Sequence, residues 1–416
     1  MLSPCREPTR DRVECMLLVL LAQLAVAAPV PTLQLVESWP AETSLDQPDI
    51  RDAHETWREM IRGAKESIEI AQFYLSPDPD AEDRMDGILV AIEAAALRGV
   101  QVKILADAKF AKTYPDDLAR FEKMSGVEVR RYDMKPITGG VMHAKYFIVD
   151  AKIAYLGSQN FDWRSLEHIQ ELGVRFTGPS SVAALRAVFA QDWALAASAV
   201  KIEPTAVVAE PMSWRREEVT VRFVASPKEL VAPSTWDLPY ILGAINDAKA
   251  TVRVQLLGYA VVGYDKSEWR DIDDALRAAG ARGVKVQLLV SNWQKAAKKQ
   301  QVVKDLTAAD GVEVRFANIP EHSTGWQHFS RTIHSKYMVV DGAWSWVGTS
   351  NWSKDYFHSS RNVGLIVEGA PFASRLDQLH TSLWDSDYAE PVDAEKSYMS
   401  PFEVRKASTQ DDSPPK

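Results

Sequence analysis

The chain has 416 residues, of which 46% are hydrophobic and 25% charged, a composition typical of a soluble globular enzyme and a length sufficient for two domains. Lys and Arg number 48 against 57 Asp and Glu, giving a net charge of -9, which argues against a broad nonspecific grip on nucleic acid. Any positive charge that binds phosphate must therefore be local.

The first predicted element is an export signal. Residues 16–28, MLLVLLAQLAVAA, form an apolar run that is too short to span a bilayer comfortably and ends in small residues. The preceding segment mixes basic and acidic residues, so the positive region expected of a signal peptide is weak. We expect residues 1–28 to be a signal peptide and the protein to be periplasmic or secreted; an uncleaved N-terminal anchor is the alternative.

Cysteine chemistry is excluded by the same expectation. Both cysteines, Cys5 and Cys15, precede the predicted cleavage point. The mature chain would contain none, which removes disulfides, thiolate nucleophiles and Cys-ligated metals.

The remaining chain repeats itself. Each half contains a strand, then a helix ended by glycine and followed by a strand, then a further strand. These segments are 64–75, 88–107 and 126–132 in the first half, and 248–259, 273–290 and 311–317 in the second. Gly99 maps onto Gly283 at an offset of 184 residues. Alternating helices and strands predict an α/β layered lobe in each half.

This repeat sets the expected domain boundaries. We predict a first lobe over 29–205 and a second over 206–395, with the mixed, proline-bearing segment 201–217 as a linker between them. The polar end of the chain, 396–416, is predicted to be a disordered tail.

Two motifs recur within the repeat. HAKYFIVDAKIAYLGSQN occupies 143–160 and HSKYMVVDGAWSWVGTSN occupies 334–351. Side chains alternate faces along a strand, so His143 and Lys145 point the same way, as do His334 and Lys336. Asp150 and Asp341 fall on the opposite face and are expected to be structural.

Two such half sites, related by a pseudo-twofold axis, would bring two imidazoles and two ammonium groups to one centre. That arrangement suits a transition state at phosphorus, where fixed positive charges and donors stabilise the oxygens as charge develops. One neutral histidine can attack phosphorus while the other, protonated, supplies the proton that the leaving alcohol needs. The scheme requires no metal or cofactor, and residue symmetry alone leaves open which histidine is the nucleophile.

The duplicated motif, HxKxxxxD followed by GSxN or a variant of it, resembles the signature of the phospholipase D superfamily. The flanking segments LVESWP, GSQNFDWRSL, ELGV and GTSNWSKDYF resemble the branch that contains phospholipase D types three and four. The resemblance covers roughly residues 33–390 and implies two homologous α/β/α sandwich lobes with the active site between them.

The resemblance also implies residue roles. His143 would be the nucleophile and His334 the general acid. Glu171 occupies the position of a carboxylate that orients a catalytic imidazole, and the equivalent second-half residue is Asn362, so this support looks asymmetric. The phosphoryl oxygens would be held by four residues, with Ser158 supporting them or, equally well, forming a turn: Lys145, Lys336, Asn160 and Asn351.

The sequence therefore predicts a phosphodiesterase that acts through a covalent phosphohistidine, with its site complete in one chain and no obligate protein partner. Phospholipid is the expected substrate, with possible peripheral membrane contact; a 5' exonuclease acting on single-stranded nucleic acid is the alternative. A non-catalytic phosphate-binding protein is the alternative of another class. The basic run 295–304 is consistent with a nucleic-acid backbone, an anionic membrane surface or a solvated helix face.

Overall fold

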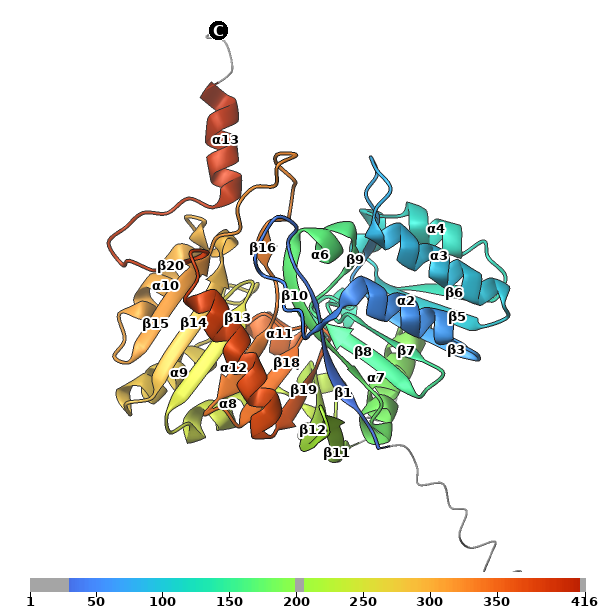
Figure 1. Cartoon of the computed structure of the whole chain (residues 1–416), viewed down its shortest axis with the longest axis horizontal. Coiled ribbons are helices and arrows are strands. Elements are labelled where there is room, and N and C mark those ends of the chain that lie inside the picture. The colour runs from blue at the N-terminus through green and yellow to red at the C-terminus, as the bar shows by residue number, and fades with distance from the viewer. Residues whose placement is uncertain (1–29, 199–205, 412–416) are drawn as a thin grey trace, which may run out of the picture. The chain divides into compact units, whose positions relative to one another are not determined.

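The computed structural model describes residues 30–198 and 206–411, so the predicted signal peptide lies outside the described residues. From residue 31 onward, the described residues form one unit built from two lobes, each around a nine-stranded mixed sheet (Figure 1). Among the described residues, no helix combines the length and apolar character needed to cross a membrane.

The first lobe is built on a sheet in the order β2-β1-β10-β8-β7-β3-β5-β6, with β16 added beside β10. Its strands are β1 Leu33–Ser38, β2 Arg51–Asp52, β3 Ser67–Gln72, β5 Gln101–Asp107, β6 Val127–Tyr132, β7 Tyr146–Val149, β8 Ile153–Gly157, β10 Ile169–Phe176 and β16 Thr332–Ile333. A separate pair, β4 Leu75–Ser76 and β9 Phe161–Asp162, lies beside it.

The second lobe repeats this order as β11-β12-β19-β18-β17-β13-β14-β15-β20. Its strands are β11 Glu210–Trp214, β12 Glu217–Ser226, β13 Thr251–Leu256, β14 Lys285–Ser291, β15 Val312–Ala317, β17 Tyr337–Val340, β18 Trp344–Gly348, β19 Asn362–Glu368 and β20 Ala389–Pro391. The paths β1 to β6 and β12 to β15 match strand for strand, which confirms the predicted duplication. In both lobes the strand after the HxK motif, β7 or β17, is an apolar run buried on both faces.

Helices complete the layers. The larger ones are α2 Ala53–Gly63, α3 Arg84–Leu97, α7 Pro179–Ser198, α8 Leu238–Asp247, α9 Asp271–Ala281, α10 Gln300–Thr307, α12 Ala370–Trp384 and α13 Pro401–Asp411. Short helices are α4 Asp116–Phe121, α5 Lys135–Thr138, α6 Trp163–Glu167 and α11 Lys354–His358. The first sheet packs on α2 and α3 through one core, and the second packs on α8, α9 and α10 through another. A third core, with α7 and α12, joins both sheets.

The predicted linker is partly structured. Residues 210–217 of the segment 201–217 contribute β11, the turn and the first residue of β12, and this hairpin extends the second sheet. Arg215 and Arg216 form the turn with φ of 51° and 72°. The alternation of buried and exposed side chains along β11 explains why a segment of mixed polarity forms a strand.

The prediction of a disordered tail is wrong over much of its length, because residues 401–411 form α13. Ser400 and Glu403 cap the start of this helix: the Ser400 backbone N donates to Glu403 Oε2 at 2.8 Å, and the Glu403 N donates to Ser400 Oγ at 3.4 Å. Tyr398 is buried, and the Phe402 ring lies 5.3 Å from that of Trp293. These anchors outweigh the polar composition of the segment.

Candidate active site

The two HxK motifs meet where the lobes join. The backbone N of His143 donates to the carbonyl of Arg361 at 3.0 Å, and the backbone N of His334 donates to the carbonyl of Gln170 at 2.8 Å. Each motif is thus fixed by the other lobe, at equivalent positions. Both imidazoles are nearly buried, with 6% and 8% of their surface exposed.

The imidazole of His143 is oriented by an amide. Its Nδ1 lies 3.0 Å from Asn362 Oδ1. The Asn362 amide is itself fixed, because its Nδ2 donates to the Tyr356 carbonyl at 2.9 Å and its Oδ1 accepts from the Thr349 hydroxyl at 2.9 Å. An acceptor at Nδ1 places the proton of neutral imidazole there and leaves Nε2 as the free base.

The imidazole of His334 is oriented by a carboxylate instead. Its Nδ1 lies 2.7 Å from Glu171 Oε2, and Glu171 is fully buried. Both supports reach across the join between lobes, since Glu171 lies on β10 of the first lobe and Asn362 on β19 of the second. The structure therefore matches the expectation that the two supports are asymmetric.

This asymmetry separates the two histidines electrostatically. Burial and the charges of Lys145 and Lys336 hold the pKa of His143 well below its usual range. Burial also lowers the pKa of His334, but the Glu171 carboxylate opposes that shift. Burial tends to raise the pKa of Glu171, yet His334 and Lys336 outweigh it and keep the carboxyl ionised. The pKa of His334 is therefore lowered less than that of His143, and of the two imidazoles His334 is the one whose charged form has a carboxylate partner.

The lysines supply buried positive charge. Both are fully buried, and each ammonium donates to the carbonyl of the histidine two residues earlier, Lys145 to His143 and Lys336 to His334. Burial lowers the pKa of Lys336 to about 7, and burial together with the charge of Lys336 depresses the pKa of Lys145 well below its usual range. An anion between them would restore their protonation.

Two asparagines complete the centre. Asn160 Nδ2 donates to the Tyr74 hydroxyl at 3.3 Å, and Asn351 Nδ2 donates to the Tyr356 hydroxyl at 3.2 Å. An amide NH₂ carries two donor hydrogens, so in each asparagine one donor hydrogen is not used by the bond to tyrosine.

Ser158 differs from its predicted role in phosphate binding. Its hydroxyl donates to the Leu172 carbonyl at 3.2 Å and accepts from the Leu172 N at 3.0 Å, and the side chain has no exposed surface. Thr349 bonds equivalently to the N of Val363, at 3.1 Å. Both hydroxyls therefore fix the strand that carries the support of a histidine, Glu171 or Asn362.

Asp150 and Asp341 lie away from the centre, as expected. The Asp150 carboxylate accepts hydrogen bonds from the backbone N atoms of residues 65–67, and Asp341 does the same for residues 249–251. Each aspartate has a positive φ, 52° and 51°. They anchor the entry to β3 and β13, which pair with β7 and β17, the strands that directly follow the lysines.

Sequence reasoning missed the residues that brace the centre. Arg361 is fully buried and forms a bidentate ion pair with Asp192 on α7, at 2.8 and 2.9 Å. Its counterpart Gln170 accepts from Gln255 Nε2 at 2.7 Å. The signal that would have found both is their place directly before Asn362 and Glu171 in the repeat.

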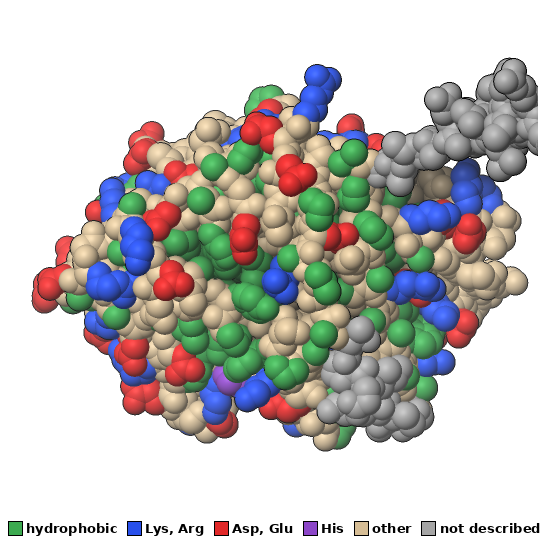
Figure 2. Space-filling model, turned by 90° about the horizontal axis from the view of Figure 1, so that it is seen from below, with side chains coloured by type: hydrophobic (Ala, Val, Ile, Leu, Met, Phe, Trp, Pro, Cys, Tyr) green, Lys and Arg blue, Asp and Glu red, His purple; other side chains and the backbone are tan. Residues whose placement is uncertain are grey.

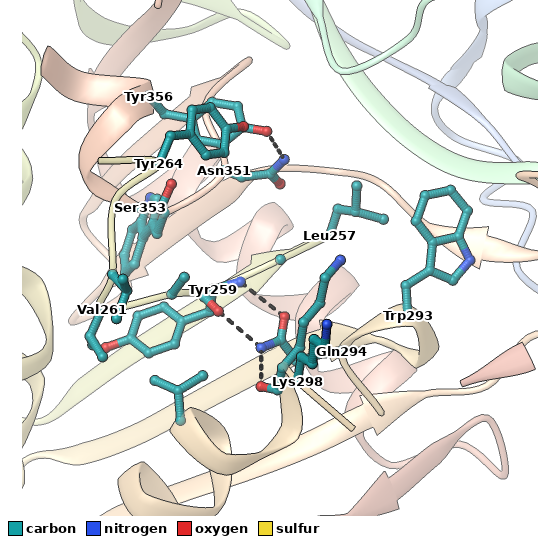
Figure 3. Close-up of a pocket in the computed structure, with 16 residues that line it drawn as sticks. Leu257, Tyr259, Val261, Tyr264, Trp293, Gln294, Lys298, Asn351, Ser353 and Tyr356 are labelled. Carbon is teal, nitrogen blue, oxygen red and sulfur yellow. Dashed lines mark hydrogen bonds between the residues drawn. The ribbon is translucent and has the colours of Figure 1, made fainter. Parts of the chain in front are cut away.

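A cavity of about 320 Å³ opens beside the centre in the second lobe. Figure 3 shows Asn351, Tyr356 and Tyr264 on one side of it, Gln294 and Lys298 on the opposite side, and Trp293 at one end. The cavity shares Asn351 with the predicted catalytic residues, so a group bound there would lie next to the paired motifs.

Comparison with known proteins identifies the family. The family model described as "Cardiolipin synthase, PLD-like domain" matches residues 57–193 and 241–384, one segment in each lobe. Phospholipase D Z of Dictyostelium discoideum is 31% identical over 397 residues, which cover 87% of this chain and 91% of that protein. The 5'-3' exonuclease PLD4 of Mus musculus is 31% identical over 411 residues, covering 87% of this chain and 80% of that protein.

Solved structures show the same fold at low identity. Phosphatidylserine synthase of Haemophilus influenzae matches with a TM-score of 0.61 at 11% identity, covering 86% of this chain and 90% of that chain. Polyphosphate kinase of Porphyromonas gingivalis matches with a TM-score of 0.57 at 12% identity, covering 92% and 56%. With the paired HxK motifs converging on one centre, these similarities show that the chain belongs to the phospholipase D superfamily, in the branch of the type three and four enzymes, and is a phosphodiesterase.

Proposed function

We propose that the protein cleaves a phosphodiester through a covalent phosphohistidine on His143, with His334 as the general acid. The observation that carries this assignment is the difference between the two supports. An amide at Nδ1 of His143 leaves that imidazole neutral and nucleophilic, whereas the Glu171 carboxylate stabilises the charged form of His334.

The first step forms one bond and breaks another. Nε2 of His143 attacks phosphorus, and the bond from phosphorus to the leaving oxygen breaks as His334 gives that oxygen its Nε2 proton. Lys145 and Lys336 stabilise the charge on the non-bridging oxygens, and the bound anion raises the pKa values of both lysines and of His334.

The second step restores the enzyme. Water attacks phosphorus, neutral His334 takes its proton, and the bond between phosphorus and His143 breaks to release a phosphomonoester. An alcohol in place of water gives phosphoryl transfer instead of hydrolysis. The same two imidazoles serve both steps.

The site favours a phosphodiester near the end of its substrate, because the imidazoles and asparagines are 6% to 8% exposed and the lysines fully buried. Phospholipid headgroups and the 5' ends of nucleic acid both meet this requirement, and the names of the relatives support both substrates. On the face seen in Figure 2, acidic and basic side chains are interspersed rather than gathered into one basic patch. Export of the chain, through residues 1–28, is part of this proposal.

The test is a trapping experiment with the purified protein in the presence of a chelator. Dibutyroyl phosphatidylcholine and a single-stranded oligonucleotide labelled at its 3' end are assayed side by side for turnover. For trapping, each substrate carries a radioactive label at the scissile phosphorus and the reaction is quenched during turnover. We expect label on His143, identified by peptide mass spectrometry, and none on His143→Ala. Turnover without a protein-bound phosphoryl group would refute the covalent mechanism, and silence on both substrates would refute the proposed activity.

A further inference from the structure

Two aromatic rings flank the imidazole of the first HxK motif. The Phe73 ring lies 5.0 Å from that of His143 at an interplanar angle of 66°, and the Tyr356 ring lies 4.9 Å from it at 83°. Both contacts are edge-to-face, and both rings are half-buried. The rings come from opposite lobes, since Phe73 directly follows β3 and Tyr356 lies on α11. His143 is therefore held by a ring from each lobe in addition to Asn362.

The second motif lacks such rings. Phe73 maps onto Leu257 at the offset of 184 residues that relates β3 to β13, and Tyr356 maps onto Ser165 at the offset of 191 that relates the two histidines. Neither counterpart is aromatic. Within residues 30–198 and 206–411, no ring contact is made by the His334 imidazole. The flanking pair of rings thus distinguishes one histidine from the other.

Tyr356 contacts three residues of the centre. Besides its ring contact with His143, its hydroxyl accepts from Asn351 Nδ2 at 3.2 Å, and its backbone carbonyl accepts from Asn362 Nδ2 at 2.9 Å. Figure 3 shows the bond to Asn351. Because Asn362 is the amide at Nδ1 of His143, one residue fixes both the ring of the nucleophile and its hydrogen-bond partner.

Phe73 contacts both functional side chains of the first motif. The Lys145 ammonium lies 4.6 Å from the centroid of its ring, and the His143 ring lies 5.0 Å from it. The quadrupole of an aromatic ring attracts a cation over its face. The ring therefore favours the charged form of Lys145 and places no negative charge beside His143.

A nucleophilic imidazole needs contacts that orient it without protonating it. A carboxylate at Nδ1, as His334 has, favours the imidazolium, which has no lone pair at Nε2 for attack. An amide and two packed rings restrict the imidazole and supply no negative charge. Orientation is decisive for rate, since a misplacement of about 1 Å costs about 100-fold.

We propose that Phe73 and Tyr356 are positioning residues of the nucleophile, and that they hold the plane of the His143 imidazole so that Nε2 faces phosphorus. The inference rests on the proposed function and deepens it, because it names residues that set the rate of the first step. In that step the Nε2 lone pair forms the bond to phosphorus, and the leaving oxygen departs with the electron pair of the broken bond. Nδ1 keeps the proton that it donates to Asn362.

The test measures the first step alone. With bis(p-nitrophenyl) phosphate the leaving group needs no proton, so a burst of p-nitrophenolate reports attack by His143 without the general acid. Phe73→Leu gives His143 the residue type found at the equivalent place in the second lobe, and Tyr356→Leu removes the other ring but keeps an apolar side chain. At saturating substrate we expect each to lower the rate constant of the burst by about 10- to 100-fold, and Tyr356→Phe to stay within about threefold of wild type.

Inhibition by inorganic phosphate separates orientation from binding. Tyr356→Phe and Tyr356→Leu both lose the hydroxyl that accepts from Asn351, so the two variants should share one Ki although their bursts differ. A shared Ki also shows that the site of Tyr356→Leu is intact. Equal bursts in these two variants would overturn the role of Tyr356, and a wild-type burst in Phe73→Leu would overturn that of Phe73.

The matched control is Tyr114→Leu. The Tyr114 ring belongs to the same group of first-lobe rings and stacks on Tyr74 at 4.8 Å, but it makes no ring contact with His143. This variant should keep the burst of the wild type. A loss equal to that of Phe73→Leu would show that any ring of the group has the same effect, and would overturn the specific role of the flanking pair.

Phosphoramidate separates failure of the positioning role from failure of the proposed function. It phosphorylates histidine directly, as the bond from Nε2 to phosphorus forms and ammonia leaves, and peptide mass spectrometry measures the label on His143. Slower labelling in Phe73→Leu and Tyr356→Leu than in Tyr356→Phe, in a protein that cleaves no phosphodiester, would uphold the positioning and reject the phosphodiesterase. Equal labelling in all variants, or no label on His143 in the wild type, would overturn the positioning.

Discussion

The two lobes share one scaffold but differ at the few positions that decide the chemistry. β10 and β19 occupy equivalent places, yet one presents Glu171 to the histidine of the opposite lobe and the other presents Asn362. The loops after β3 and β13 are equivalent too, yet one carries the aromatic rings of Phe73 and Tyr74 and the other carries Leu257 and Gly258, which line the cavity beside Asn351. Duplication thus supplies the pair of imidazoles, and a single replacement gives each a different hydrogen-bond partner.

The largest effects are expected from removing each imidazole in turn. With a natural substrate, both His143→Ala and His334→Ala should lower kcat by about 10⁴-fold or more. With a p-nitrophenyl phosphodiester, whose leaving group needs no proton, formation of the covalent intermediate should survive in His334→Ala and vanish in His143→Ala. Stopped-flow detection of a p-nitrophenol burst measures this step, and a burst in His143→Ala alone would reverse the two roles.

The buried contacts that hold Arg361 and Gln170 should contribute unequally to the free energy of unfolding. Asp192→Asn leaves the buried guanidinium of Arg361 without its charged partner and should lower the free energy of unfolding by about 3–5 kcal/mol. Gln255→Ala removes two neutral hydrogen bonds, the one that Gln255 donates to Gln170 and the one that it accepts from the Tyr337 hydroxyl, and should cost about 1–3 kcal/mol. Urea denaturation measures the free energy of unfolding of both variants. Equal losses would show that the charged pair contributes no more to stability than the neutral contacts.

Changing the group that supports each histidine should shift the pH dependence of kcat in opposite directions. Glu171→Gln removes the carboxylate that opposes the fall in the pKa of His334, so the acid loses its proton at lower pH and the alkaline limb of kcat shifts down. Asn362→Asp adds a charge beside His143, raises its pKa and moves the acidic limb up. The expected loss of kcat at neutral pH is about 10²-fold for each, and pH-rate profiles of the two variants check the signs.

The smallest effect concerns protons bound with the substrate anion. The pKa of Lys336 is about 7, so this lysine is largely neutral in the free enzyme at pH 8. A bound phosphate should raise this pKa, and Lys336 should then take up about one proton or less. Calorimetry in buffers of different ionisation enthalpy measures this uptake. Lys336→Met should lower this uptake by up to about one proton and leave the share taken up by Lys145 and His334, whose pKa values are also depressed. Proton release from the wild type would contradict the low pKa values.

Much of this arrangement follows from the sequence alone. The two-residue spacing in HxK places His143 and Lys145 together, and the constant offset between halves predicts two equivalent lobes. Which support serves which histidine did not follow, because Glu171 and Asn362 each act on the opposite lobe. The hydroxyl of Ser158 was misassigned because a buried bond to Leu172 leaves no trace in the motif. The helix at 401–411 was missed because its anchors, Tyr398 and Phe402, precede the polar run.

The interface between the two lobes is part of the active site. Both imidazole supports and both backbone bonds that fix the motifs span it. A slight rotation of one lobe against the other would distort all four bonds together, so both histidines would lose their orientation at once rather than separately. Activity therefore depends on the correct alignment of the two lobes. A substitution far from the active site that tilts one lobe would lower activity as the loss of a histidine does.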